Sequence, residues 1–275
     1  PAGMYADSVY PFGHYGASGI AFEAGVTGKN LTEWQYGLAS IKPRWNVSGT
    51  YMQVLPRFIS TLPDGTDERE FLLDFFHNEY EMLSMVFLKG YEWPFDVRKA
   101  GSGSSIIDIL VYIECCMKGR RVFLDFRSNP LGRDIDFTKL SPEAAEYLEK
   151  AGAAFGTPID RLLHMNSPAV DFYRNKGVDL VKEPLEIALC AQHNNGGLSI
   201  DKWWQTNIEG FFAVGEVSAS HGVYRPGGSA LNSGQVGSTR AARFIASNRQ
   251  GAPEDMNKFK TSTFGKISEI TALCD

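Results

Sequence analysis

The stretch of sequence that decides the fold is GFFAVGEVSASHGVYRPGGSALNSGQVGSTRAARFIASN, residues 210–248. Its first part, Phe211 to Glu216, has the apolar composition of a short buried strand that ends on Gly-Glu. The Gly-Gly-Ser sequence at 227–229 follows, and it opens a long segment of helical character. A strand, a glycine-containing loop and a helix in this order predict an α/β unit.

The glycine residues of this unit indicate that something lies very close to its backbone. At the helix entry, glycine lets a ligand approach the main chain, and the exposed N–H groups of the helix start favour negative charge there. Inside the helix, Gly234 and Gly237 each cost about 1 kcal/mol relative to Ala. The neighbour that would explain this cost is either a ligand ring or packed backbone. An ordinary crossover with tight packing accounts for the same pattern.

The rest of the chain mixes helical and strand patterns. Residues 67–88 repeat apolar side chains at a helical period, and Ser105-Ile-Ile-Asp108 resembles a capping box that opens another helix. We expect helices at 18–25, 67–88, 105–118, from Ser141 onward and at 167–176, and strands within 42–62 and at 121–125, 185–192 and 211–216. The polar tail after residue 250 is expected to be helical where it continues. Together these elements predict a fold of mixed α/β and α+β class.

Composition excludes several classes of function. Hydrophobic residues make up 43% and charged residues 21% of the 275 residues, as in a soluble globular protein. A net charge of -5 gives no electrostatic case for binding nucleic acid, and no apolar run approaches the ~18 residues that span a bilayer. The cysteines show no metal-binding spacing and fit a reducing cytoplasm, so we predict a cytoplasmic protein without a metal site.

Three blocks of sequence then suggest a family. They are Gln192-His-Asn-Asn-Gly196-Gly197-Leu198, Gly210-Phe-Phe-Ala-Val-Gly215-Glu216 and His221-Gly-Val-Tyr-Arg225-Pro-Gly-Gly-Ser-Ala-Leu231. In this order and spacing they resemble the fumarate reductase and succinate dehydrogenase flavoprotein family of FAD-dependent oxidoreductases. A looser match, Gly119-Arg-Arg-Val-Phe-Leu-Asp125, resembles a block of the family's capping domain.

The resemblance implies a domain organisation. It predicts the C-terminal part of a split, Rossmann-like FAD-binding domain together with an inserted α+β capping domain. Residues 1–38 are then a return segment of the FAD-binding domain, 39–190 the capping domain, and 191–249 the last FAD-domain segment. Residues 250–275 would be a tail that continues into a longer parent chain.

The resemblance also implies FAD as the cofactor. Glu216, with Gly215 before it, matches the acidic residue that binds the ribityl chain. The helix start at Gly228, Ser229, Ala230 and Leu231 matches the segment beneath the pyrimidine edge of the flavin, where a helix dipole would stabilise the reduced anion. Gly196 and Gly197 match a further glycine pair beside the cofactor. No G-x-G-x-x-G motif is present, so we expect FAD to bind weakly or not at all unless a missing N-terminal FAD-binding segment is supplied.

The substrate residues of the family are mostly replaced. Arg225 is retained, whereas Gln192 takes a position that usually holds His, with His193 one place later, and Gly37 takes another. The capping-domain Arg-Asp pair falls on Ser105-Ile106, and Arg98 or Lys99 would substitute only if the loop shifts. Two carboxylates buried against one arginine would leave a charge unpaired, which costs several kcal/mol. The substrate is therefore expected to be neither fumarate nor succinate.

We name four candidate catalytic residues and keep more than one function open. The candidates are Arg225, His193, Gln192 and Tyr224, the last as an acid or as a packing residue. The first hypothesis is hydride transfer between FAD and a small-molecule substrate, with an electron-transfer partner. The alternatives are a non-catalytic capping and docking module of a larger flavoprotein, and a relative of aspartate oxidase or adenylylsulfate reductase.

Overall fold

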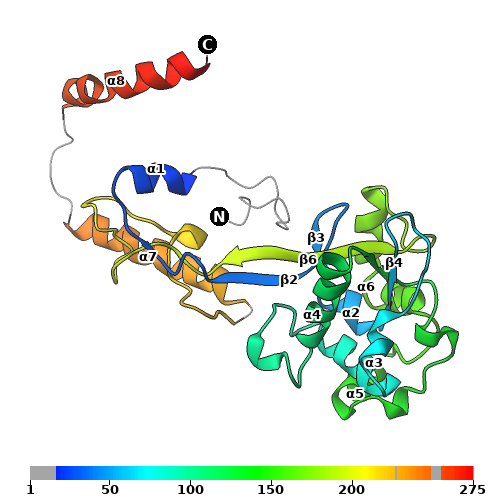
Figure 1. Cartoon of the computed structure of the whole chain (residues 1–275). Coiled ribbons are helices and arrows are strands. Elements are labelled where there is room, and N and C mark those ends of the chain that lie inside the picture. The colour runs from blue at the N-terminus through cyan, green and yellow to red at the C-terminus, as the bar shows by residue number, and fades with distance from the viewer. Residues whose placement is uncertain (1–16, 227, 249–254, 275) are drawn as a thin grey trace.

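The computed structural model describes residues 17–226, 228–248 and 255–274. Two strands, β2 (Trp34–Ser40) and β6 (Leu185–Asn194), run side by side from one part of the molecule to the other (Figure 1). One part is built around the helices α2 to α6, and the other around α1 and α7. The strand expected at 185–192 is confirmed and is two residues longer.

The main sheet has five strands in the order β3-β2-β6-β5-β4, and every neighbouring pair is antiparallel. Its other members are β3 (Trp45–Asn46), β4 (Arg57–Thr61) and β5 (Arg121–Asp125). A second, two-stranded sheet pairs β1 (Gly28–Lys29) with β7 (Gly197–Leu198). The strand expected at 121–125 is therefore confirmed.

The larger hydrophobic core lies between Leu38 and Ile187 in the sequence. It packs the sheet against α2 (Thr50–Gln53), α3 (Glu79–Leu88), α4 (Ile106–Tyr112), α5 (Pro142–Lys150) and α6 (Pro158–Asn175). The π-helical turn Ile113–Met117 continues α4, and 3₁₀ turns lie at Phe71–Asp74, Val97–Lys99, Pro130–Gly132 and Phe137–Lys139. The domain boundaries expected at 38/39 and 190/191 fall inside β2 and β6, so both strands continue from this core toward the other part.

A second, smaller core joins segments from both ends of the chain. Ala21 and Val26 pack against Leu198 and Ala213, and α1 (Ala17–Glu23) lies beside this cluster. The helix α7 (Ser229–Asn248) begins and ends where the sequence predicted, and α8 (Met256–Cys274) confirms that the tail is helical. Segments near residue 20 and near residue 200 therefore form one structural unit.

One helix prediction was wrong at its start, and another matches only the second half of a longer helix. The helix expected at 67–88 begins only at Glu79, because Asn78 Oδ1 accepts hydrogen bonds from the N–H groups of Tyr80 and Glu81 and so caps α3. The helix expected at 167–176 is the second half of α6, which begins at Pro158 after a capping box between Thr157 and Asp160. The helical backbone is broken at Asn166, where φ is −159° and ψ is 66°, so Pro168 lies in the first turn after this kink, as predicted.

The capping box expected at Ser105 is also absent. Ser105 makes no side-chain cap for α4, and its Oγ instead accepts a hydrogen bond from the N–H of Asp96 at 3.0 Å. The helix itself is confirmed. Ser105 thus fastens the loop before α4, rather than the first turn of the helix.

The strand expected at 211–216 does not form. In the described part of the chain this segment makes one isolated bridge, between Gln205 and Phe212, and it ends in the 3₁₀ turn Gly215–Val217. Phe211 is 38% exposed and Val214 37%, while Ala213 is buried. A strand needs a partner whose backbone completes its hydrogen bonds, and no described strand lies beside this segment.

Close packing explains one of the two glycines inside α7, Gly237. A Cβ atom at Gly237 would lie 2.4 Å from Trp204 Nε1, and one at Gly234 would meet Gly215 Cα at 3.6 Å. Trp203 stacks on Phe244 of the same helix, with ring centroids 5.5 Å apart. The aromatic pair at 203–204 is therefore the surface on which α7 packs.

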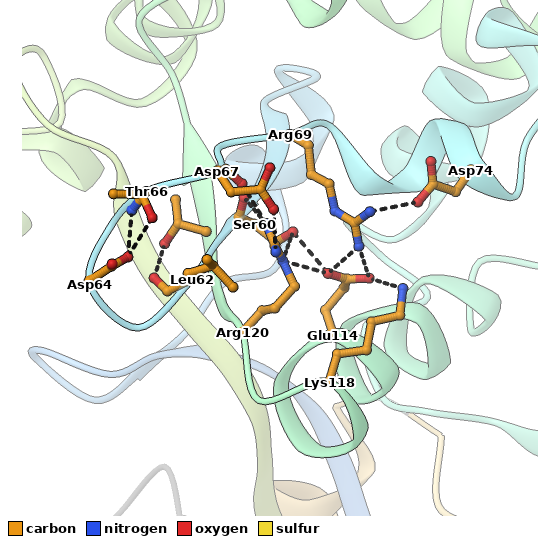
Figure 2. Close-up of polar contacts among 11 residues, drawn as sticks. Ser60, Leu62, Asp64, Thr66, Asp67, Arg69, Asp74, Glu114, Lys118 and Arg120 are labelled. Carbon is orange, nitrogen blue, oxygen red and sulfur yellow. Dashed lines mark hydrogen bonds and ion pairs between the residues drawn. The ribbon is translucent and has the colours of Figure 1, made fainter.

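A buried charge network holds β4, the following turn and the end of α4 together (Figure 2). Glu114 is buried, and its carboxylate forms ion pairs with Arg69, Lys118 and Arg120. Ser60 Oγ donates a further hydrogen bond to Glu114 at 2.9 Å. Although burial by itself raises the pKa of a carboxyl, the hydrogen bonds from Lys118 and Ser60 outweigh it and hold the pKa of Glu114 below its ordinary value.

Replacing Gly237 by Ala should lower the free energy of unfolding by about 1–3 kcal/mol, because the new methyl group would overlap the Trp204 indole. Gly234→Ala is the matched control on the same helix, since its methyl group makes an ordinary contact. We expect it to be neutral or stabilising by up to about 1 kcal/mol. Urea unfolding measures both variants, and equal effects would contradict the packing role of Trp204.

Replacing Glu114 by Gln should lower the free energy of unfolding by about 3 kcal/mol, because the buried guanidinium of Arg120 loses a charged partner. Since the pKa of Glu114 is lowered in the folded state, the advantage of the wild type should be complete above pH 4.5 and shrink as the pH falls through the folded pKa. Glu146→Gln, at an exposed pair with Lys150, is the control and should leave stability nearly unchanged, because solvent screens such a pair. A similar loss in both variants would show that the network contributes nothing beyond a surface ion pair.

Candidate active site

The pairing of β2 with β6 sets the position of the first two site residues. Gln35 lies opposite His193, and Tyr36 lies opposite Ala191, so Gln192 is an extra residue on β6. This β-bulge changes the direction of the side chains next to it, and bulges commonly have this role beside functional sites. The structure thus places His193 across from Gln35, and Gln192 is the unpaired residue of the bulge.

His193 is paired with Glu216. The ring is 4% exposed, and its Nδ1–H donates to Glu216 Oε1 at 2.9 Å, whereas Nε2 is buried and has no partner among the described residues. Burial raises the pKa of a carboxyl, but the hydrogen bond and charge of His193 outweigh burial and lower the pKa of Glu216. Glu216 is therefore an anion that contacts the imidazole of His193.

His221 adds a second buried imidazole. Its ring meets that of His193 edge to face, with centroids 4.8 Å apart, and neither of its nitrogens has a hydrogen-bond partner in the described part of the chain. Burial, and then the charges of His193 and Arg225, lower the pKa of His221. His221 is accordingly neutral at neutral pH.

Arg225 is held in place by Gln35 through two reciprocal hydrogen bonds. The guanidinium NH2 group donates to Gln35 Oε1 at 2.6 Å, and Gln35 Nε2 donates to the Arg225 carbonyl at 3.1 Å. Burial lowers the pKa of Arg225, although a guanidinium stays protonated in proteins, and its Nε is buried without an acceptor among the described residues. Arg225 thus presents a fixed positive charge with an unused donor.

Tyr224, unlike the members of this buried group, is partly exposed. It is about half exposed, and the guanidinium of Arg98 lies 4.3 Å from the centre of its ring. Arg98 in turn forms an ion pair with Asp96 at 2.8 Å. Tyr224 therefore contacts the 89–105 loop of the larger core, which places Arg98 beside the site but already paired.

The predicted glycines fall into two groups. Cβ atoms at Gly196 and Gly197 would lie 1.9 Å from Asn30 O and 2.2 Å from Val217 O, so close backbone packing requires glycine at both positions. Gly215 and Gly228 have φ values of +74° and +78°, and a Cβ atom there would meet no atom of the described residues within 4 Å. The described residues therefore leave open space beside each glycine of the second pair.

The start of α7 borders the same open space. Ser229 begins the helix, and its Oγ donates to the Pro226 carbonyl at 2.8 Å. Ala230 is half-buried, and Leu231 is 81% exposed, an unusual position for a leucine. The helix start is thus accessible rather than enclosed.

Comparison with known proteins shows which proteins the chain resembles. Residues 118–231 match the family model described as FAD binding domain, and this match contains the whole cluster formed by His193, Glu216, His221 and Arg225. The chain is fumarate reductase flavoprotein-like. FAD, the cofactor expected from the sequence, is the one that the matched model describes.

Relatives of known activity resemble only part of this flavoprotein-like chain. It is 48% identical over 73 residues to a subunit of the fumarate reductase (CoM/CoB) of Methanothermobacter marburgensis, which is 26% of this chain and 13% of that protein. It is 30% identical over 110 residues to L-aspartate oxidase of Vibrio cholerae, 39% of this chain and 18% of the oxidase. The matched stretches are therefore short pieces of both proteins.

A solved quinol-fumarate reductase shows the same fold over 93% of this chain and 40% of its own, with a TM-score of 0.57 and 18% identity. The chain thus spans less than half the length of that structure. This likeness, together with the family match, confirms the fold class expected from the sequence. Among the helices that the structure describes, none is long and apolar enough to cross a membrane.

The residues around the start of α7 fit a flavin. At Gly215 and Gly228 no atom of the described residues lies within 4 Å of where a Cβ atom would stand, so a ligand can approach the backbone there, and the exposed Leu231 offers an apolar contact. Exposed N–H groups at a helix start suit the charge that a reduced flavin carries. Buried polar atoms nearby, such as Arg225 Nε, still lack partners among the described residues.

Sequence reasoning missed Gln35 and Asn195 as site residues. Asn195 Nδ2 donates to the Val223 carbonyl at 2.9 Å, and its Oδ1 is buried without a partner in the described part of the chain. Gln35 contacts Arg225 across 190 positions of sequence. No local pattern signals such a contact, although Asn195 stands next to the Gly196–Gly197 pair and was within reach of the motif.

Proposed function

We propose that the protein is an FAD-dependent oxidoreductase that transfers a hydride between flavin and a small organic substrate with one carboxylate. One observation carries this proposal. Most of the buried side-chain nitrogen and oxygen atoms that lack a partner among the described residues belong to one group: Gln192, His193, Asn195, His221 and Arg225. Each such atom costs about 1–3 kcal/mol when nothing satisfies it, so the group has the character of a ligand site.

The charges of this group support a single carboxylate. Arg225 carries its guanidinium, while Arg98 is engaged with Asp96 and Tyr224. Gly37 offers no side chain, and the indole of Trp93 occupies the space where one would stand, 2.6 Å from a Cβ atom. A second substrate carboxylate would remain uncompensated at a cost of several kcal/mol, which argues against fumarate and succinate.

The flavin would lie against the helix start and the two open glycines. Gly215, Gly228 and residues Ser229 to Leu231 would hold it, and when bound it supplies two-electron hydride chemistry. Gly196 and Gly197 would act indirectly, since they let the 196–197 turn pack on Asn30 and Val217. Arg225 would orient the carboxylate of the substrate. The two buried imidazoles would exchange protons with the substrate.

A capping and docking module is the second candidate. The buried residues of the larger core lie between Leu38 and Ile187 and form a cluster separate from the smaller core. The larger core would therefore fold without flavin. Such a module would work in the cytoplasm by covering the cofactor of a longer flavoprotein. Flavin binding decides between the two candidates.

Titration of the full-length protein with FAD tests the enzyme proposal. We expect a yellow protein with a dissociation constant at or below the micromolar range, and reoxidation of the reduced flavin by a monocarboxylate acceptor such as acrylate faster than by fumarate. Visible absorbance measures both steps. A folded, colourless protein at micromolar FAD would support the docking module instead, and faster reoxidation by fumarate would contradict the single-carboxylate site.

Replacing Arg225 by Ala in the FAD-loaded protein should lower kcat/KM about 100-fold, since a charged hydrogen bond is worth up to about 3 kcal/mol. The flavin content should stay the same, because Arg225 is assigned to the substrate. Arg174→Ala is the control, since Arg174 makes an exposed pair with Asp171 on α6. Turnover that survives Arg225→Ala would remove this residue from the site.

A further inference from the structure

We propose that Glu216 and His193 form an acid–base dyad in which the carboxylate orients the imidazole so that its Nε2 exchanges a proton with the substrate. The catalytic part rests on the proposed function. The dyad itself is a property of this chain, and it can be measured without flavin or substrate.

The geometry fixes which nitrogen carries the proton. A neutral imidazole has one N–H donor and one acceptor nitrogen, and the partner of one nitrogen determines the state of the other. His193 Nδ1 lies 2.9 Å from Glu216 Oε1, and a carboxylate accepts only from an N–H. Nε2 is therefore the lone-pair nitrogen, and it is buried without a partner among the described residues. An unprotonated ring nitrogen is one requirement of a general base.

The groups that surround His193 differ in charge. Glu216 supplies a negative charge from the 215–217 turn, and Gln35 on β2 lies opposite His193 without carrying charge. His221, whose ring touches that of His193, has its pKa lowered by burial and so adds no repulsion while it is neutral. Arg225 is the cation of this group, and a bound carboxylate would neutralise it. A protonated His193 would then face one net negative charge, that of Glu216.

The proposed step balances as a dehydrogenation. The substrate would give up one hydrogen from one atom, with its two electrons, as a hydride, for which a bound, oxidised flavin would supply the acceptor. The neighbouring atom loses a proton to His193 Nε2, and its bonding pair forms the new double bond. In the reverse direction the imidazolium returns the proton. Glu216 keeps its charge throughout and acts as a positioning residue that stabilises the imidazolium.

This assignment gives Glu216 a role that differs from the sequence-based expectation. A residue that bound only the ribityl chain would have no need of an imidazole partner. One carboxylate oxygen of Glu216 nevertheless contacts His193. The Glu216 side chain is 46% exposed. Because the two roles affect different observables, experiment separates them.

The first test is the tautomer of His193, read from ¹⁵N NMR of histidine-labelled full-length protein at a pH where the ring is neutral. We expect the Nδ1–H form in the wild type and a shift toward the Nε2–H form in Glu216→Ala. His77→Asn identifies an exposed histidine as a reference signal. An Nε2–H tautomer in the wild type, or no change in Glu216→Ala, would overturn the dyad whether or not the protein binds flavin.

The second test is the pH–rate profile of the FAD-loaded Glu216→Gln variant. We expect kcat to fall about 10–100-fold with KM changed less than about threefold. The acid limb should move to lower pH, because loss of the carboxylate destabilises the imidazolium. Glu209→Gln, an exposed residue nearby, is the control and should match the wild type. A variant that loses flavin but keeps the wild-type profile when saturated with FAD would show that Glu216 serves the cofactor alone.

Discussion

The structure depends on one constraint, the antiparallel pairing of β2 with β6. These strands are about 150 residues apart in the sequence, and closing so long a loop has an entropic cost that only a continuous ladder and a shared core can offset. At one end the ladder belongs to the large core around Leu38 and Ile187. At the other end it leads to the two-stranded sheet of β1 and β7 and to the smaller core. The position of one core relative to the other follows from these strands.

The candidate site occupies the point where this ladder becomes irregular. A regular strand would point alternate side chains to opposite faces, so Gln192 and His193 would face opposite ways. The bulge breaks that alternation and sets His193 against Gln35, which in turn holds Arg225. Three segments that are remote in sequence thus meet through side chains whose hydrogen bonds are only partly completed. Irregular pairing is less stable than a regular ladder, and its presence here fits a functional demand.

The sequence predicted the elements that depend on local signals and missed those that depend on distant partners. The bounds of α7 were correct because Ser229 and the glycine before it mark the helix start. The segment 211–216 looked like a strand because its residues are apolar, yet pairing requires a neighbour that composition does not reveal. Likewise, Arg225 could be selected from its motif, but its partner Gln35 could not, because nothing in either local sequence encodes the contact. Tertiary context decided each of these cases.

A comparison of two buried arginines shows why incomplete hydrogen bonding, rather than charge, marks the site. Arg161 is fully buried in the large core, and every nitrogen of its guanidinium donates, to the carbonyls of Val54, Phe155 and Gly156 and to Asn129 Oδ1. Burial lowers the pKa of Arg161 to about 10, yet the group needs nothing further from outside. Arg225 is buried as well, but its Nε has no acceptor among the described residues. This unused donor agrees with the proposal that a ligand accepts from Arg225.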